Sequence, residues 1–198
     1  MYNRKMEFIT KSHRLLTCAL IFIIFSCTDR NSDVPGKLNS TMTGWWRAGS
    51  KSNSYKVFME QTGDDGRNVA TIKSIDEKID GFETLMQKCL PDKYLGKRIR
   101  MSGSIKTQDL SDWGGLWLRI DSGEPGKTLG FDNMHDGKTD RSIRGTTPWT
   151  KYEIVLNVPT STTYLAYGTL LTGQGQIWFG DLSFEIVDDD IPTTGYDF

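Results

Sequence analysis

The fold is decided by the segment between Trp149 and Val187, which reads WTKYEIVLNVP at 149–159 and TYLAYGTLLTGQGQIWFGDLSFEIV at 163–187. In its first part, apolar side chains occupy every second position, which is typical of a strand with one buried and one wet face. These positions are Tyr152, Ile154, Leu156 and Val158. The glycine-rich turn Gly173-Gln174-Gly175 separates two further strand-like runs. The segment therefore predicts the end of an antiparallel β-sandwich, not a helical enzyme core.

Short strand-like runs and turn sequences recur through the preceding part of the chain, where helix signals are scarce. Turns such as Gly63-Asp64-Asp65-Gly66 and Gly123-Glu124-Pro125-Gly126 connect the runs. The further predicted strands are 55–60, 69–74, 84–87, 98–106, 115–121, 128–132 and 164–171. Many short strands at regular spacing are typical of a sandwich or barrel. We expect an all-β, antiparallel β-sandwich that forms a single domain over residues 44–187.

The first 26 residues have the pattern of an export signal, in which positive residues precede an apolar run of 11 residues from Leu15 to Phe25. As a helix this run would be roughly 16 Å long, too short for the ~30 Å hydrocarbon core of a bilayer, so 1–26 is predicted to be a signal peptide. Ile24-Phe25-Ser26-Cys27 resembles the lipobox of bacterial lipoproteins. This resemblance implies that Cys27 is lipidated and anchors the protein to a membrane. The alternative is an ordinary secretory signal with an incidental cysteine.

Composition changes on both sides of the predicted domain. Residues 27–43 contain the predicted lipidation site and then many Ser, Asn, Thr and Asp residues, a composition typical of a flexible tether. Residues 188–198 begin with three aspartates, and we expect an acidic, disordered tail. A net charge of -1 gives no sign of the basic patch that nucleic-acid-binding proteins carry. No nucleic-acid partner is therefore expected.

The strand 115–121 carries the strongest candidate binding residues. Leu116, Leu118 and Ile120 share its apolar face. Period two then places Trp117, Arg119 and Asp121 together on the opposite face. An indole packs well against the C–H face of a sugar ring, and neighbouring charged groups can bind hydroxyls, so these three residues are candidates for glycan binding. Trp113 lies close enough in sequence to line the same rim. The alternative is that a loop or a sheet edge covers Trp117.

Asp132 and Asn133 follow the next predicted strand. Their side chains could bind a ligand, and we include them among the candidates. Asx residues after a strand more often cap a turn, however, and we prefer that interpretation. The charged segment 135–142 that follows is predicted to be a solvated loop.

The closing strand changes phase at its centre. A bulge at Gly180-Asp181 would bring both halves of its apolar pattern to one face and turn Trp178 outward, as a further binding candidate. Asp181 could then help backbone carbonyls to hold a structural calcium ion, since hard cations prefer oxygen ligands. A plain surface aspartate is the preferred alternative. The apolar positions concerned are Ile177 and Phe179, then Leu182, Phe184 and Ile186.

Taken together, several segments resemble known families. Residues 149–187 resemble the ending of galactose-binding-like jelly rolls, the superfamily that contains many carbohydrate-binding modules. The likeness extends over nearly all of 44–187 to a bacterial domain that also occurs fused to helix-turn-helix regulators. It is carried by 46–50, 81–87, 94–98, 117–119 and 131–134. The resemblance implies a jelly-roll fold without implying a particular ligand. Glu83 departs from the usual glycine, and Gly180 stands where many such modules have an acidic residue. No helix-turn-helix segment accompanies the domain, so regulator activity is not expected.

Signals for catalysis are weak. His135 is the only histidine after the signal segment, which leaves little for a catalytic triad or a histidine metal site. Carboxylates for glycoside hydrolysis are present, but no motif marks them. We expect a non-catalytic binding module, lipid-anchored at the bacterial cell envelope, that needs no cofactor and binds glycan. The alternatives are a structural or protein-interaction module and a small-molecule sensor.

Overall fold

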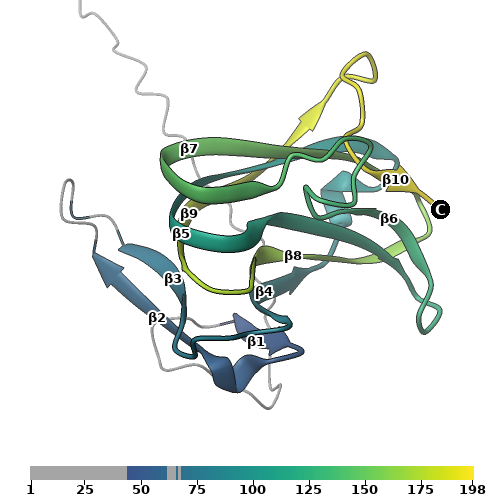
Figure 1. Cartoon of the computed structure of the whole chain (residues 1–198). Coiled ribbons are helices and arrows are strands. Elements are labelled where there is room, and N and C mark those ends of the chain that lie inside the picture. The colour runs from purple at the N-terminus through teal and green to yellow at the C-terminus, as the bar shows by residue number, and fades with distance from the viewer. Residues whose placement is uncertain (1–43, 62–65, 67) are drawn as a thin grey trace, which may run out of the picture.

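The computed structural model describes residues 44–61, 66 and 68–198 (Figure 1). The predicted signal peptide, Cys27 and tether lie outside the described residues. The described chain forms ten strands and two short 3-10 helices, and it contains no helix long and apolar enough to cross a membrane. The elements in order are β1 (Trp46–Gly49), η1 (Ser52–Ser54), β2 (Tyr55–Gln61), β3 (Asn68–Ser74), β4 (Phe82–Cys89), η2 (Asp92–Tyr94), β5 (Lys97–Ser122), β6 (Thr128–Asp132), β7 (Ile143–Val158), β8 (Thr162–Thr172), β9 (Gln176–Val187) and β10 (Tyr196–Asp197).

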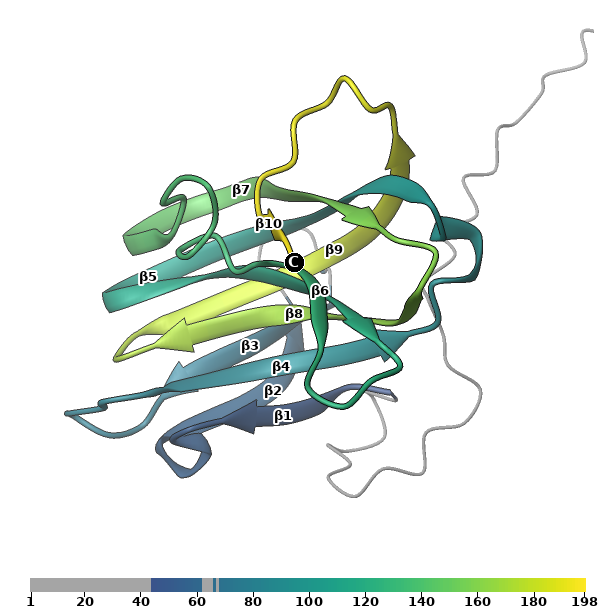
Figure 2. The same cartoon turned by 90° about the vertical axis from the view of Figure 1, so that its right-hand side faces the viewer.

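The long strand β5 belongs to two layers because its halves pair with different neighbours. Residues 97–105 pair with the second half of β7 and 98–108 with β9, whereas 114–122 pair with β8 and 118–121 with β6. We call β1-β4-β8-β5-β6-β10 sheet A and β2-β3-β9-β5-β7 sheet B. In Figure 2, β4, β8 and β5 of sheet A run side by side, with β2 and β3 of sheet B behind them. All pairings are antiparallel, and the predicted jelly-roll β-sandwich is confirmed.

The main core lies between the two sheets. Leu116, Leu118 and Ile120 are fully buried there, which confirms the predicted inward face of 115–121. Ile99 and Met101 join them from the first half of β5. Successive side chains of a strand point to opposite faces, so the residues that alternate with these along β5 face outward. The core thus fixes which residues sheet A presents on its other side.

The predicted strands are found, with differences in their extent and number. The runs 98–106 and 115–121 are parts of one strand, β5, whose pairing with β7 shifts register repeatedly between Ile105 and Gly114. β1 and β10 were not predicted. The predicted bulge in the closing strand is present: Ser102 pairs with Ser183, but Ser104 already pairs with Gly180, so β9 holds an extra residue.

The predicted disordered tail is wrong for residues 188–198. β10 pairs with β6 through Tyr196 and Phe131, and the backbone N–H of Thr194 donates to the Val155 carbonyl at 2.9 Å. Arg98 donates to the Ile191 carbonyl at 2.7 Å. These bonds are made mainly by backbone groups, which any sequence carries. The polar composition of the tail therefore gave no sign of them.

Candidate ligand-binding site

The outer face of sheet A carries a second apolar cluster, separate from the core. Trp117 belongs to it, as the alternation of β5 predicts. The other strands of the sheet contribute from the same side, so the cluster spans β1, β4, β8, β5 and β6. Its buried members are Met86, Trp117, Ala166 and Leu170, with Trp46, Ala48, Trp113 and Phe131 packed against them. A sheet face turned away from the core and still apolar is a candidate interaction surface.

The Trp117 indole lies across the neighbouring strand. Its Nε1 donates to Thr84 Oγ1 at 2.8 Å, and Thr84 belongs to β4, two strands away. Gly168 of β8 pairs with Trp117 and with Met86 on its two sides. The indole therefore crosses β8 at a position that has no side chain, and it lies along the sheet instead of standing up from it.

A hollow of about 350 Å³ opens above this indole. The sequence left open whether Trp117 is an exposed platform or is covered; with 6% of its surface accessible, the side chain is a largely covered floor. Aromatic and aliphatic side chains dominate the lining, and polar groups are few, as in many small-molecule sites. The hollow, which we call the aromatic hollow, is lined by Ala48, Phe82, Thr84, Met86, Trp113, Trp117, Arg119, Phe131, Asn133, Leu170 and Thr172.

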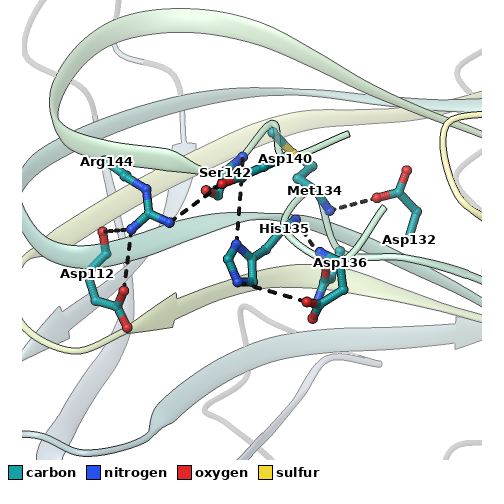
Figure 3. A network of polar contacts seen from close by, with 9 residues as sticks. Asp112, Asp132, Met134, His135, Asp136, Asp140, Ser142 and Arg144 are labelled. Atoms are coloured by element: carbon teal, nitrogen blue, oxygen red, sulfur yellow. Dashed lines mark hydrogen bonds and ion pairs between the residues drawn. The ribbon is translucent and has the colours of Figure 1, made fainter. Parts of the chain in front are cut away.

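Trp113, predicted at the rim, is supported by the loop between β6 and β7. Its ring stacks on His135 with centroids 4.7 Å apart and planes at 26°. His135 in turn lies 3.6 Å from Asp140 and 3.9 Å from Asp136 (Figure 3). Hydrogen bonds from the Ser142 hydroxyl and backbone N–H lower the pKa of Asp140 to about 2. The segment predicted to be a plain solvated loop therefore positions one wall of the hollow.

Asp132 and Asn133 form the turn that leads into this loop. Asp132 is fully buried, accepts from the Met134 backbone N–H at 2.7 Å and is ion-paired with Arg141, so its proposed contact with a ligand is wrong. Asn133 Oδ1 accepts from the backbone N–H groups of His135 and Asp136 at 3.0 and 2.6 Å. The preferred turn interpretation is confirmed for both residues. Asn133 also lines the aromatic hollow, where one amide N–H remains for a ligand.

A second, polar hollow of about 490 Å³ adjoins the first, and Arg119 lines both. Arg119 binds Asp121 through Nε at 2.8 Å and Nη2 at 3.0 Å. A guanidinium has five N–H donors, so this bidentate pair leaves further donors for a ligand. The polar hollow is lined by Lys88, Arg119, Asp121, Ser122, Gly123, Glu124, Pro125, Gly126, Lys127, Thr128, Thr163 and Tyr164.

Trp178 and Asp181 lie on β9, away from both hollows. Trp178 points outward from sheet B, donates Nε1 to Glu60 Oε1 at 2.6 Å and lies 5.2 Å from the Lys106 ammonium. The structure therefore does not bring it together with Trp117. Asp181 is exposed on the bulge with a φ of 55°. Within the described ranges, no group of three or more His, Cys, Asp or Glu side chains could hold a metal ion. The calcium site stays a prediction.

Strand β1, which supplies Ala48, is held by a buried ion pair. Arg47 Nε lies 2.6 Å from Glu83 Oε1, and the Glu83 side chain is fully buried. Nearby, burial raises the pKa of the Tyr55 phenol well above its usual range, and the Glu83 charge raises it further. The pair fixes the edge of sheet A beside the aromatic hollow.

Most of the lining was missed by sequence reasoning, because it comes from other strands and from the turn between β5 and β6. The alternation of 115–121 identifies Trp117 but gives no cross-strand register, so its neighbours on β4 and β8 could not be named. One signal was present: Gly168 interrupts an otherwise continuous strand pattern, and glycine inside a strand often marks a close approach. The missed residues of the aromatic hollow are Ala48, Phe82, Thr84, Met86, Phe131, Leu170 and Thr172. Those of the polar hollow are Lys88, Ser122, Gly123, Glu124, Pro125, Gly126, Lys127, Thr128, Thr163 and Tyr164.

Comparison with known proteins supports the resemblance found in the sequence. The chain is similar to the uncharacterized HTH-type transcriptional regulator YbfP of Bacillus subtilis (strain 168), with 36% identity over 159 residues. The match covers 79% of this chain and 52% of the regulator, so the chain spans about half the length of that relative. It confirms that the domain resembles one found in helix-turn-helix regulators. No family model matches the chain.

Two solved structures share the fold. The enzymatically active domain of tailspike protein 4 from bacteriophage CBA120 matches with a TM-score of 0.55 and 10% identity, over 73% of this chain and 20% of that one. A proposed sugar-binding protein from Bacteroides thetaiotaomicron VPI-5482 matches with a TM-score of 0.51 and 14% identity, over 72% of this chain and 87% of the other. At these identities the likeness concerns the fold alone.

Proposed function

We propose that this protein is a non-catalytic binding module that takes carbohydrate on the outer face of sheet A. The observation that carries the proposal is the pair of adjoining hollows, one aromatic and one polar, that share Arg119. The similar sandwich of the Bacteroides protein, itself proposed to bind sugar, is consistent with this function. The lining of the two hollows, and not this likeness, is the basis of the proposal.

The two hollows suit the mixed chemistry of a sugar. A pyranose ring has a C–H face that packs on aromatic side chains and a rim of hydroxyls that need hydrogen-bond partners. Trp113, Trp117 and Phe131 supply the apolar contacts. Arg119 and Asn133 supply N–H donors at the edge of the same hollow. Ligand sites combine apolar lining with a few placed polar groups in this way.

The carboxylates beside the hollows are arranged for structure and binding. Asp121 is held by Arg119 at 2.8 Å, and Glu124 lies 2.9 Å from the Lys127 ammonium. A glycosidase needs one carboxyl group as acid and an opposed one as nucleophile or base. Both carboxylates that line the polar hollow are already engaged by neighbouring cations. This supports binding without hydrolysis.

The proposal is tested by screening the purified domain on a glycan array and titrating the best ligand calorimetrically. Trp113→Ala should weaken binding at least tenfold, because aromatic anchors in a pocket carry much of the affinity. Trp178→Ala is the matched control. It also removes a tryptophan side chain, but from the outer face of sheet B, and should leave the glycan affinity unchanged. Absence of any glycan ligand, or unchanged affinity in Trp113→Ala with unaltered thermal stability, would contradict the proposal.

We further propose that the module is tethered to a membrane of the bacterial cell envelope through lipid on Cys27. The support is the resemblance of Ile24-Phe25-Ser26-Cys27 to a lipobox. One acyl chain binds a bilayer only marginally, so stable anchoring needs several. A clickable fatty acid fed to expressing bacteria should label the wild-type protein and not Cys27→Ala. Equal labelling of the two, or none of either, would show that the cysteine is incidental.

A further inference from the structure

The polar hollow has one positive charge more than its carboxylates neutralise. Of its three cationic side chains, Arg119 is paired with Asp121 and Lys127 with Glu124. Lys88 is the third, and no carboxylate of the described chain lies within ion-pair distance of it. Its ammonium instead lies 5.5 Å from the centroid of the Tyr164 ring. The Tyr164 side chain is partly exposed, so this cation stands at the surface with the ring beside it.

Lys88 and Arg119 occupy one row across sheet A. Ala166 of β8 pairs with Lys88 on one side and with Arg119 on the other. Because the strands are about 4.8 Å apart, the two Cα atoms are separated by about 10 Å, with only a methyl group between their side chains. An anion in the polar hollow, which both side chains line, would therefore meet the Lys88 ammonium and the remaining Arg119 donors together.

The next row contains the floor of the aromatic hollow. Met86, Gly168 and Trp117 lie two residues along their strands from the row of Lys88, Ala166 and Arg119. Two residues of extended chain correspond to about 7 Å. A sugar ring above Trp117 and an anion between Lys88 and Arg119 thus belong to adjacent parts of one ligand, longer than a single neutral sugar.

We propose that the ligand is an acidic oligosaccharide, whose uronate or sulfate group is bound between Lys88 and Arg119 while a neighbouring ring packs in the aromatic hollow. The inference rests on the proposed function and specifies its ligand class. An ammonium is a compact point charge that pairs with carboxylate and sulfate alike. Both possible ligands carry an anionic group on a sugar chain, and the experiment distinguishes carboxylate from sulfate.

The test uses pairs of oligosaccharides in which one member carries more anionic groups than the other. Xylotetraose is compared with its glucuronate-branched form, methyl-esterified tetragalacturonate with the free acid, and unsulfated chondroitin with sulfated chondroitin. We expect an acidic member to bind about tenfold tighter than its less charged partner, with affinity falling as salt is added. The first two pairs report on carboxylate and the third on sulfate.

Lys88→Gln should remove this preference, so that the variant binds the acidic and the neutral partner with equal affinity. Lys151→Gln, at an exposed lysine on β7 outside both hollows, is the control and should behave as wild type. Equal binding of neutral and acidic partners, or an unchanged preference in Lys88→Gln, overturns the inference while the proposed function stands. If neither this panel nor the array yields a bound glycan, the proposed function fails and the inference with it.

Discussion

Trp117 has a structural and a binding role at once, because its indole is both packed into the sheet and placed beneath the hollow. Its Nε1 bond to Thr84 ties β5 to β4 across β8, and the Thr84 hydroxyl in turn donates a hydrogen bond to the Thr169 carbonyl at 2.9 Å. Such chained hydrogen bonds are costly to interrupt in a buried setting. The position therefore tolerates little change, whatever ligand lies above it.

Trp117→Phe should lower the free energy of unfolding by about 2 kcal/mol, because it removes buried ring atoms and leaves the Thr84 hydroxyl without its donor. Urea denaturation measures this change. Trp178→Phe, which also loses an indole hydrogen bond but at a half-buried position, should cost less than about 1 kcal/mol. Equal costs for the two variants would mean that the Trp117 indole is not packed as described.

The connection between β6 and β7 shows how a charged segment can be well defined at the scale of an element. Side chains of opposite charge alternate along it, and each carboxylate finds a local donor, as with Asp140 and Ser142. Asp132 and Asn133 fix its start through bonds to the next backbone N–H groups. The composition alone predicts a solvated loop, because a solvated loop and a well-defined connection can both be rich in charged residues. What distinguishes them is the stacking of His135 on Trp113, a contact between distant parts of the chain.

The Asp140 carboxylate in this connection should stay ionised to low pH. The pKa of Asp140 is lowered from 3.8 to about 2, chiefly by the Ser142 hydroxyl. The pKa of Asp140 is lower in the folded protein than in the unfolded chain, so its ionised form stabilises the fold. This contribution is complete above the unfolded pKa of 3.8 and disappears as the pH falls through about 2. Ser142→Ala should bring the pKa of Asp140, followed by NMR titration, back towards 3.8, whereas Ser142→Thr should keep it low. The same pKa in Ser142→Ala and wild type would exclude the hydroxyl as the cause.

Strands and their faces could be predicted at the element scale, because alternation is a local property of the sequence. Leu116, Leu118 and Ile120 identify the buried face directly, and the phase change before Leu182 correctly indicates a bulge. The continuity of β5 could not be predicted in this way. Between 107 and 114 its pairing with β7 shifts register several times, and Asp109 adopts a φ of 53°. This middle section of β5 passes from one sheet to the other and has no constant buried face, so it shows no alternation.

For the whole molecule, the sandwich followed from the sequence, but the hollows did not. A hollow depends on which side chains face each other across strands, as with Trp117, Gly168 and Met86. That register is set by the complete sheet and has no local signal. The ordered tail has a similar origin, because its bonds to β6 and β7 form only after both strands are in place.

Deleting residues 188–198 tests whether the tail is part of the domain. The deletion removes the pairing of Tyr196 with Phe131, the bonds of Thr194 to Val155 and the 2.8 Å bond from Asn157 to Asp197. Several hydrogen bonds at about 1 kcal/mol each, less the entropy of ordering the tail, should cost about 1–3 kcal/mol in urea denaturation. Amide exchange should accelerate in β6 and remain slow in β4, which the tail does not contact. Since β6 carries Phe131 of the aromatic hollow, glycan affinity should fall as well. Unchanged protection of β6 would show that the tail is dispensable.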